Sequence, residues 1–314
     1  MFRSLLLVCL LTATACSAEV GDEVDRATWG PGNVSSGAHG QGRVLLERQR
    51  TMGNTEVDAS QRVTARFLRA TPGADPSVIA RLVSSSEERQ REVELGCHER
   101  QLLPPHAPSL LHELQQDAER LRTVGDLAIE LLDVGDVGLV SGDERHPLSP
   151  RAFPTVAALV SGMVYTSRDD SWRFPQSEPF AFVATGSADT PAFRFLVDAP
   201  SALAELRLGD LDPSRDEIAL VRGRRLPLSW RADVAGDRVT VRFESSADQA
   251  SYVLCAFADH GTAVIPGYFF QHQAGHELNV MVTRQRRQQH VASVFERIVV
   301  DFDDAVRVRV TLVD

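Results

Sequence analysis

The sequence contains no lysine, so all 33 of its basic residues are arginine. This bias indicates a GC-rich genome and predicts no chemistry by itself. The 43 aspartates and glutamates outnumber the arginines and give a net charge of −10. No basic patch interleaved with aromatic residues occurs, and an acidic surface repels phosphate backbones. We therefore expect no nucleic-acid partner.

Known catalytic motifs are also missing. The sequence has no Gly-x-Ser-x-Gly elbow, no His-Glu-x-x-His pair, no phosphate-binding loop and no dinucleotide fingerprint. Glu130 or Asp133 could form an acid/base pair with an aspartate of the set Asp301, Asp303 and Asp304. Acids that bound strands are more often turn and edge residues, which is the favoured interpretation. We predict no catalytic residue and no cofactor, and a noncatalytic protein is favoured over an enzyme.

Long apolar runs are absent except at the N-terminus. A positively charged start precedes an apolar core at residues 5–11, and the small residues 12–15 follow. A helix that spans a bilayer needs about 20 apolar residues, so this core is too short to span. The pattern predicts a cleaved signal peptide over residues 1–15.

The residue after the predicted signal peptide indicates how the mature protein is attached to a membrane. Cys16 ends a motif, residues 13–16, that resembles the bacterial lipobox, which prefers Leu where this chain has Ala13. In a lipobox the cysteine becomes the new N-terminus and its thiol is alkylated by diacylglycerol. We predict that Cys16 carries lipid, palmitate included, and anchors the protein in the cell envelope. The resemblance to Gram-negative lipoproteins implies the outer membrane, because Ser17 rather than Asp follows the cysteine. The residues 16–42 are rich in Gly, Ser and acids and predict a flexible tether.

Beyond the tether, the apolar residues repeat mainly with a period of two. At 63–67, 239–243 and 306–312 they alternate with Arg and Thr, which is typical of strands with one face on a core and one in water. Shorter strand patterns occur at 127–132, 156–165, 181–185, 193–197, 218–221, 226–230, 252–257, 278–283 and 298–302. Strands without interleaved helices predict a mainly β protein with two tandem antiparallel β-sandwich domains of the immunoglobulin or fibronectin type.

Two segments depart from the strand pattern. Residues 76–83 and residues 109–122 have the capping and apolar spacing of short helices. Turn residues and acids interrupt the strand pattern between 199 and 213. We therefore predict an N-terminal β-rich domain at 43–205 and a C-terminal β-sandwich domain at 206–314.

Two cysteines remain in the mature chain. Cys9 leaves with the signal peptide and Cys16 is acylated, which leaves Cys97 and Cys255. In an oxidising compartment these thiols can form one disulfide. The alternative is two separate buried thiols that act as small apolar residues. Both lie in strand-like runs, 93–97 and 252–255, so geometry must decide between the two outcomes.

Histidines supply one weak metal hypothesis. His272 and His276 are four residues apart, the spacing that aligns two ligands on a helix, and Asp259 and His260 lie upstream. Gly275 falls between the pair in a strand-rich region, so solvated loop histidines are the stronger interpretation.

Loop aromatics are the candidates for binding. Trp172 and Phe174 follow a charged turn, and Tyr268, Phe269 and Phe270 follow a Pro-Gly turn. Such rings can stack on sugars or anchor a protein partner. The alternative is that each ring closes the end of its own core.

Several turn and core motifs also carry a family resemblance. They lie at 131–136 (LLDVGD), 153–154 (FP), 160–165 (VSGMVY), 185–187 (TGS), 191–193 (PAF), 199–200 (AP), 228–230 (LSW), 237–239 (DRV), 255–261 (CAFADHG), 265–266 (IP) and 284–286 (RQR). Together they resemble a group of uncharacterised envelope lipoproteins of GC-rich Gram-negative bacteria that have tandem β-sandwich modules. The resemblance covers most of the chain after the tether. It implies a fold and no chemistry, so no ligand or catalytic residue is carried over from it.

These features predict a lipid-anchored envelope protein whose noncatalytic modules bind a protein or a glycan, or serve as a structural spacer. Two alternatives stay open. One is an unrecognised metal-dependent hydrolase that uses the region of His260, His272 and His276. The other is a self-assembling surface subunit, in which an edge strand pairs with another chain.

Overall fold

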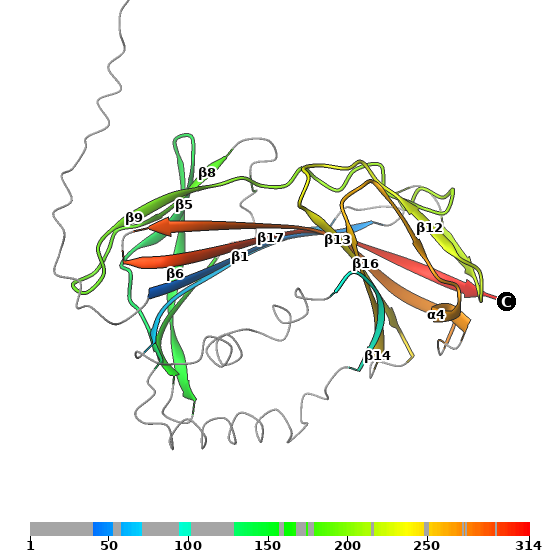
Figure 1. The fold of residues 1–314 in the computed structure, drawn as a ribbon, viewed down its shortest axis with the longest axis horizontal. Helices are drawn as coiled ribbons and strands as arrows, with labels where there is room; N and C mark the ends of the chain where they lie inside the picture. Colours follow the sequence, from blue (N-terminus) through cyan, green and yellow to red (C-terminus); the bar gives the residue numbers. More distant parts are fainter. Residues whose placement is uncertain are drawn as a thin grey trace, which may run out of the picture. The chain divides into compact units, whose positions relative to one another are not determined.

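The computed structural model (Figure 1) describes residues 40–52, 58–70, 94–101, 129–156, 160–167, 174, 179–214, 217–247, 251–271, 273, 275–292 and 294–314. All of them belong to the unit Ser36–Asp314. This described part is mainly β, as the sequence predicts, and contains one short helix, α4 (Tyr268–Gln271). Within it, no helix has the length and apolar character needed to cross a bilayer. The predicted helices at 76–83 and 109–122 lie outside the described residues.

The strands form a large sheet and a small one. They are β1 (Gly40–Met52), β2 (Asp58–Ala70), β3 (Gly96–Gln101), β4 (Ile129–Leu131), β5 (Val137–Ser141), β6 (Glu144–Val156), β7 (Val160–Ser167), β8 (Phe180–Ala184), β9 (Phe193–Val197), β10 (Arg207–Leu208), β11 (Ile218–Val221), β12 (Leu226–Ser229), β13 (Arg238–Ser245), β14 (Ser251–Ala258), β15 (Thr262–Ile265), β16 (Glu277–Ala292) and β17 (Phe295–Val313). The large sheet has the order β3-β14-β13-β16-β17-β1-β2-β4-β7-β6-β5-β8-β9, and β11 pairs with the end of β17. The small sheet has the order β10-β12-β15.

The large sheet is mixed, which corrects the expectation of purely antiparallel sheets. β17 pairs in parallel with both β1 and β11, and β4 pairs in parallel with β7. Figure 1 shows β1 beside β17, although the two strands lie at opposite ends of the described chain. Their pairing places Val44 and Leu46 level with Val300 and Phe302, so that all four side chains enter one core.

Two hydrophobic cores lie along the same long strands. The first core gathers Phe67, Phe182 and other buried residues of β1, β2 and β5 to β9 with Phe295 and Phe302 of β17. Leu132 and Val134, which follow β4, also belong to it. The second core gathers residues of β10 to β16 with Val306 and the apolar residues after it in β17. The small sheet packs on the second core through β12 and β15. The predicted division of the chain after residue 205 stays a prediction, and β17 contributes to both cores.

The first described strand begins before the predicted end of the tether at residue 42. β1 starts at Gly40, inside the segment 16–42. A Cβ atom at Gly42 would lie 2.9 Å from Cδ1 of Phe67, so this glycine permits close packing on the first core. In the sequence alone, the same glycine contributes to a flexible composition.

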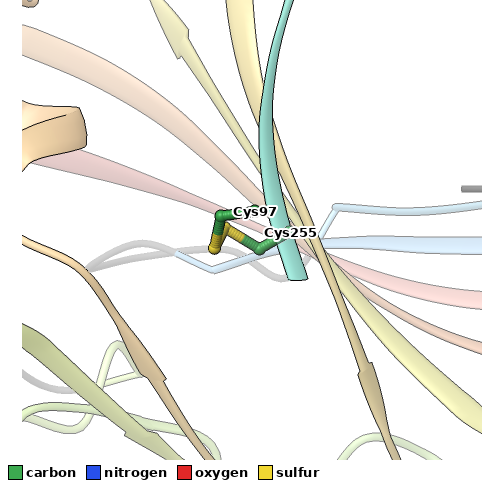
Figure 2. Close-up of a disulfide and its surroundings, with 2 residues drawn as sticks. All are labelled: Cys97 and Cys255. Atoms are coloured by element: carbon green, nitrogen blue, oxygen red, sulfur yellow. A yellow bond between two sulfur atoms is a disulfide. The ribbon is translucent and has the colours of Figure 1, made fainter. Parts of the chain in front are cut away.

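The disulfide between Cys97 and Cys255 joins β3 to β14 (Figure 2). The two cysteines are direct partners in the antiparallel pairing of these strands. Cys255 is fully buried in the second core, and Cys97 packs against that core. Of the two outcomes that the sequence leaves open, the structure has the bonded one.

A side-chain contact holds β9 against β16 beside the first core. The Gln288 amide accepts a hydrogen bond from the Asp198 N–H (3.2 Å) and donates one to the Asp198 carbonyl (3.1 Å). The His290 ring stacks on Phe195 with 4.7 Å between the ring centroids. The amide of Gln288 thus pairs with the end of β9 as a neighbouring strand would.

Acidification should weaken the contact between β9 and β16. Burial lowers the pKa of His290, and the Asp198 carboxylate raises it by less. A histidine whose pKa is lower in the folded state contributes stability above its unfolded pKa of about 6.5 and loses it as the pH falls below that value. We expect the melting temperature to fall between about pH 7.5 and about pH 5.5, one unit on either side of that pKa. The fall should be smaller in His290→Phe, which keeps the stacking without titrating. Equal falls in the two proteins would show that His290 has no part in the effect.

Candidate functional site

One face of the large sheet carries a cluster of buried ion pairs between the two cores. Asp304, in the middle of β17, is fully buried. Its Oδ1 accepts from Arg48 Nε at 2.6 Å, and its Oδ2 accepts from Arg50 Nη2 at 3.1 Å. The backbone N–H of Leu203 donates to the same Oδ2 at 2.6 Å. Asp304 therefore ties β1 and β17 to the connection that follows β9.

Asp259 and Arg284 form the second pair of this cluster. Arg284 Nε donates to Asp259 Oδ2 at 2.8 Å, and Trp230 Nε1 donates to Asp259 Oδ1 at 2.5 Å. Arg284 also donates to the carbonyls of Ser201 (3.0 Å) and Arg231. The carboxylate and the guanidinium are thus both hydrogen-bonded, as buried charges require.

Arg286 completes the cluster at the end nearer the first core. Its Nε donates to both carboxylate oxygens of Asp237 (3.0 and 3.2 Å), and its Nη2 donates to Asp233 Oδ2 at 2.9 Å. Burial by itself would lower the pKa of Arg286, but the hydrogen bonds and charge of Asp237 outweigh it and raise this pKa. Burial would raise the pKa of Asp233, but its hydrogen bonds from Ser201 and the charges of Arg286 and Arg284 lower it. Arg286 and Asp233 therefore both stay charged at neutral pH.

Two carboxylates of β17, Asp301 and Asp304, are held in ion pairs, on opposite faces of the sheet because they are three positions apart in the strand. Asp301 receives Arg43 Nη2 at 3.0 Å and Arg287 Nε at 2.6 Å, and Asp304 is paired as described above. The expectation that these acids lie in turns or at strand edges is wrong, because β17 runs without a break from Phe295 to Val313. Arginines on the neighbouring strands β1 and β16 allow the acids to be buried in mid-strand.

The opposite face of the sheet holds a different feature, a groove that crosses the strands. Successive side chains of a strand point to opposite faces, so Thr283 and Arg284 belong to different sides. On the groove side, one transverse row consists mostly of small residues. This row is Ala256 (β14), Thr240 (β13), Thr283 (β16), Ala305 (β17), Gln49 (β1) and Ser60 (β2).

Longer side chains form the two walls of this groove. One wall is the adjacent row of Leu254, Arg242, Met281 and Arg307, and the other is the row of Gln285, Asp303, Glu47 and Arg62. Between them lies a cavity of about 400 Å³, which Glu244 and Asn279 also line. We call this feature the cross-strand groove. Figure 1 shows the central strands that it crosses, β13, β16, β17 and β1.

Four uncharged hydrogen-bonding side chains of the groove have no partner among the described residues. Thr240 and Thr283 are 8% and 5% exposed, and their hydroxyls have no hydrogen-bond partner among the described residues. The same holds, within the described ranges, for the amides of Asn279 and Gln285. Elsewhere in the groove Arg242 pairs with Glu244, and its guanidinium lies 4.3 Å from the Tyr252 ring centroid. Polar groups that border a cavity and have no partner within the protein are available to hydrogen-bond a ligand.

Of the aromatic residues predicted to bind a ligand, the structure buries two and exposes one. Phe174 lies in the first core, 5.0 Å from Phe302 between ring centroids, and Phe270 lies in the second core, 5.0 Å from Phe243. Both are fully buried, so neither ring can meet a ligand. Tyr268 is exposed and contacts Phe269, which packs partly on the second core. Trp172 lies outside the described residues.

The predicted metal-binding residues do not converge among the described residues. Asp259 is committed to Trp230 and Arg284, His260 is exposed, and Nδ1 of His276 lies 3.4 Å from the Leu312 carbonyl oxygen. Over the described ranges, no group of three or more His, Cys, Asp or Glu side chains could hold a metal ion. His272 lies outside these ranges, as does Cys16, the predicted site of lipid attachment.

The comparisons with known proteins give no assignment. Neither the protein-family models nor the curated proteins contain a match to this chain. The groove and the ion-pair cluster are therefore interpreted from their own chemistry.

The sequence alone does not predict the groove, although it shows that some of the groove residues face away from the core. The alternation at 239–243 identifies Thr240 and Arg242 as outward-facing polar residues. Small residues that meet in one row become a groove only when the strand register is known. That register joins positions 49, 240, 283 and 305, which lie far apart in the chain.

Proposed function

We propose that this chain is a lipid-anchored protein of the bacterial cell envelope, held at the outer membrane through Cys16, with a noncatalytic module that binds a partner in the cross-strand groove. The observation that carries the proposal is the contrast between the two faces of the large sheet. On one face, Asp259 is held by Arg284 and Trp230, and Asp304 is held by Arg48 and Arg50. On the other face, Thr240 and Thr283 line a cavity with unused hydroxyls.

The finer architecture belongs to the same proposal. Two tandem β-sandwich modules, divided after residue 205, would each surround one of the two hydrophobic cores. The short apolar core before Cys16 and the polar residues 16–42 support a lipid anchor with a spacer. A metal-dependent hydrolase is less well supported, since Asp259 would have to leave both Trp230 and Arg284 to bind a metal.

The anchor is tested by replacing the lipidated cysteine. In Cys16→Ser, incorporation of radiolabelled palmitate should fall to background, because the serine hydroxyl is not a substrate for thiol alkylation. The protein should move from the membrane fraction to the soluble envelope fraction, since its predicted membrane contact is the lipid. Labelling and fractionation of cells that express the full chain measure both effects.

A matched control is the other cysteine of the N-terminal segment. Cys9→Ser changes the predicted apolar core and leaves Cys16 in place, so it should keep both the label and the membrane association. If Cys16→Ser remained labelled and membrane-bound, the lipid anchor would be wrong.

A further inference from the structure

We propose that the cross-strand groove binds a chain of uncharged sugars, a neutral oligosaccharide. The inference rests on the proposed function and names the ligand of that binding module. It is carried by the geometry of the groove, the balance of its charges and the chemistry of its unused groups.

The position of the groove restricts how a ligand can be recognised. β13, β16, β17 and β1 are interior strands, and each pairs with a neighbour on both sides. Their backbone N–H and C=O groups are therefore used within the sheet, and a peptide cannot add to it as an extra strand at this place. Recognition must come from side chains.

The charges of the groove disfavour an anionic polymer. Arg48 also borders the cavity, but its guanidinium donates to Asp304. The remaining charged side chains balance, with Arg62, Arg242 and Arg307 against Glu47, Glu244 and Asp303. Balanced charges of this kind give no net field to attract phosphate or uronate chains. A ligand without net charge fits this lining.

The uncharged groups of the groove fit hydroxyls better than they fit a protein surface. Protein interfaces have an apolar, often aromatic centre, whereas Leu254, Met281 and Ala305 are scattered among polar residues here. Thr240 and Thr283 offer hydroxyls on the floor, and Asn279 and Gln285 offer amides beside it. Hydroxyls and amides can both donate and accept, which matches the paired donors and acceptors of sugar hydroxyls.

The dimensions also suit an extended sugar chain. The cavity of about 400 Å³ falls within the range of ligand-binding pockets. Within the cavity lining this row runs from Thr240 (β13) to Ser60 (β2), and four strand spacings of about 4.8 Å give it a length of about 19 Å. A linear oligosaccharide can lie along such a row and present its hydroxyls to each strand in turn.

The test is a titration of the full chain carrying Cys16→Ser, which avoids the lipid. The probes are maltotetraose, chitotetraose and mannotetraose, with tetragalacturonate as the anionic comparison, followed by calorimetry and ligand-observed NMR. At least one neutral tetrasaccharide should bind. Its affinity should fall about tenfold or more in Thr240→Val/Thr283→Val, which keeps the shape of the floor and removes two hydrogen-bonding groups.

A matched control is Thr311→Val. Thr311 is an exposed threonine of β17 on the same side of the strand, outside the groove lining, so its replacement should leave the affinity unchanged. The proposal is overturned if no neutral tetrasaccharide binds, if the double variant binds as well as the parent, or if tetragalacturonate binds more tightly. A photo-crosslinker at Met281 separates this failure from that of the proposed function. Capture of an envelope protein there without sugar binding would overturn the sugar proposal and leave the binding module standing.

Discussion

Replacing Asp259 by alanine should lower the free energy of unfolding by about 3–5 kcal/mol, because it leaves a buried guanidinium without its counter-ion. Arg284 is 0% exposed and donates to Asp259 from the centre of the ion-pair cluster. Trp230 loses its acceptor in the same variant. Such a loss is a large share of the about 5–15 kcal/mol that stabilises an ordinary domain. Urea denaturation followed by circular dichroism measures it, and near-ultraviolet signals report on Trp230.

The control for this prediction is an exposed ion pair at the same junction. Arg231 pairs with Glu205, and their side chains are 64% and 63% exposed. Solvent screens such a pair, so Arg231→Ala should change the stability by less than about 1 kcal/mol. If the two variants were equally stable, the buried cluster would not be a principal support of the fold.

Loss of the disulfide should have an effect of comparable size. Cys97 and Cys255 are separated by 158 residues, and in the chain-entropy model a crosslink over so long a loop stabilises by about 5 kcal/mol. The double variant Cys97→Ala/Cys255→Ala avoids leaving a single reactive thiol. It should unfold at a lower urea concentration by an amount that corresponds to about 2–5 kcal/mol.

The remaining cysteines would confuse a thiol count, so the parent protein for this comparison carries Cys9→Ser and Cys16→Ser. In that parent, a reductant should remove most of the difference from the double variant, and denatured protein should show free thiols only after reduction. Free thiols in the unreduced parent would contradict the disulfide. An unchanged denaturation midpoint after reduction would contradict its contribution to stability.

The strands were predictable from the sequence wherever the apolar alternation is unbroken. The predicted strands at 193–197 and 218–221 coincide with β9 and β11. The alternation fails where charged residues occupy core-facing positions, as Arg284, Arg286 and Asp304 do. For that reason 298–302 and 306–312 appear as two separate strands in the sequence, whereas β17 contains both.

The pairing of the strands and the candidate site were harder to predict from the sequence. Local patterns cannot reveal that β1 pairs in parallel with β17, because the two segments are about as far apart in the chain as two described strands can be. The groove depends on that same long-range register. Two of the aromatic candidates, Phe174 and Phe270, were wrong for a simpler reason. A phenylalanine after a turn has the same local sequence whether it closes a core, as Phe174 and Phe270 do, or faces a ligand.

The parallel pairing of β1 with β17 also determines when, during synthesis, the first core can be completed. β1 has β17 as one of its two neighbours, and Phe295 to Phe302 complete the core that β1 begins. Contacts between segments so distant in the chain form late and slowly, because a long loop must close before they contribute. The first core cannot be completed until the last described strand has been synthesised. For a chain that must cross a membrane before folding, as proposed here, this topology delays compaction during synthesis and so favours export.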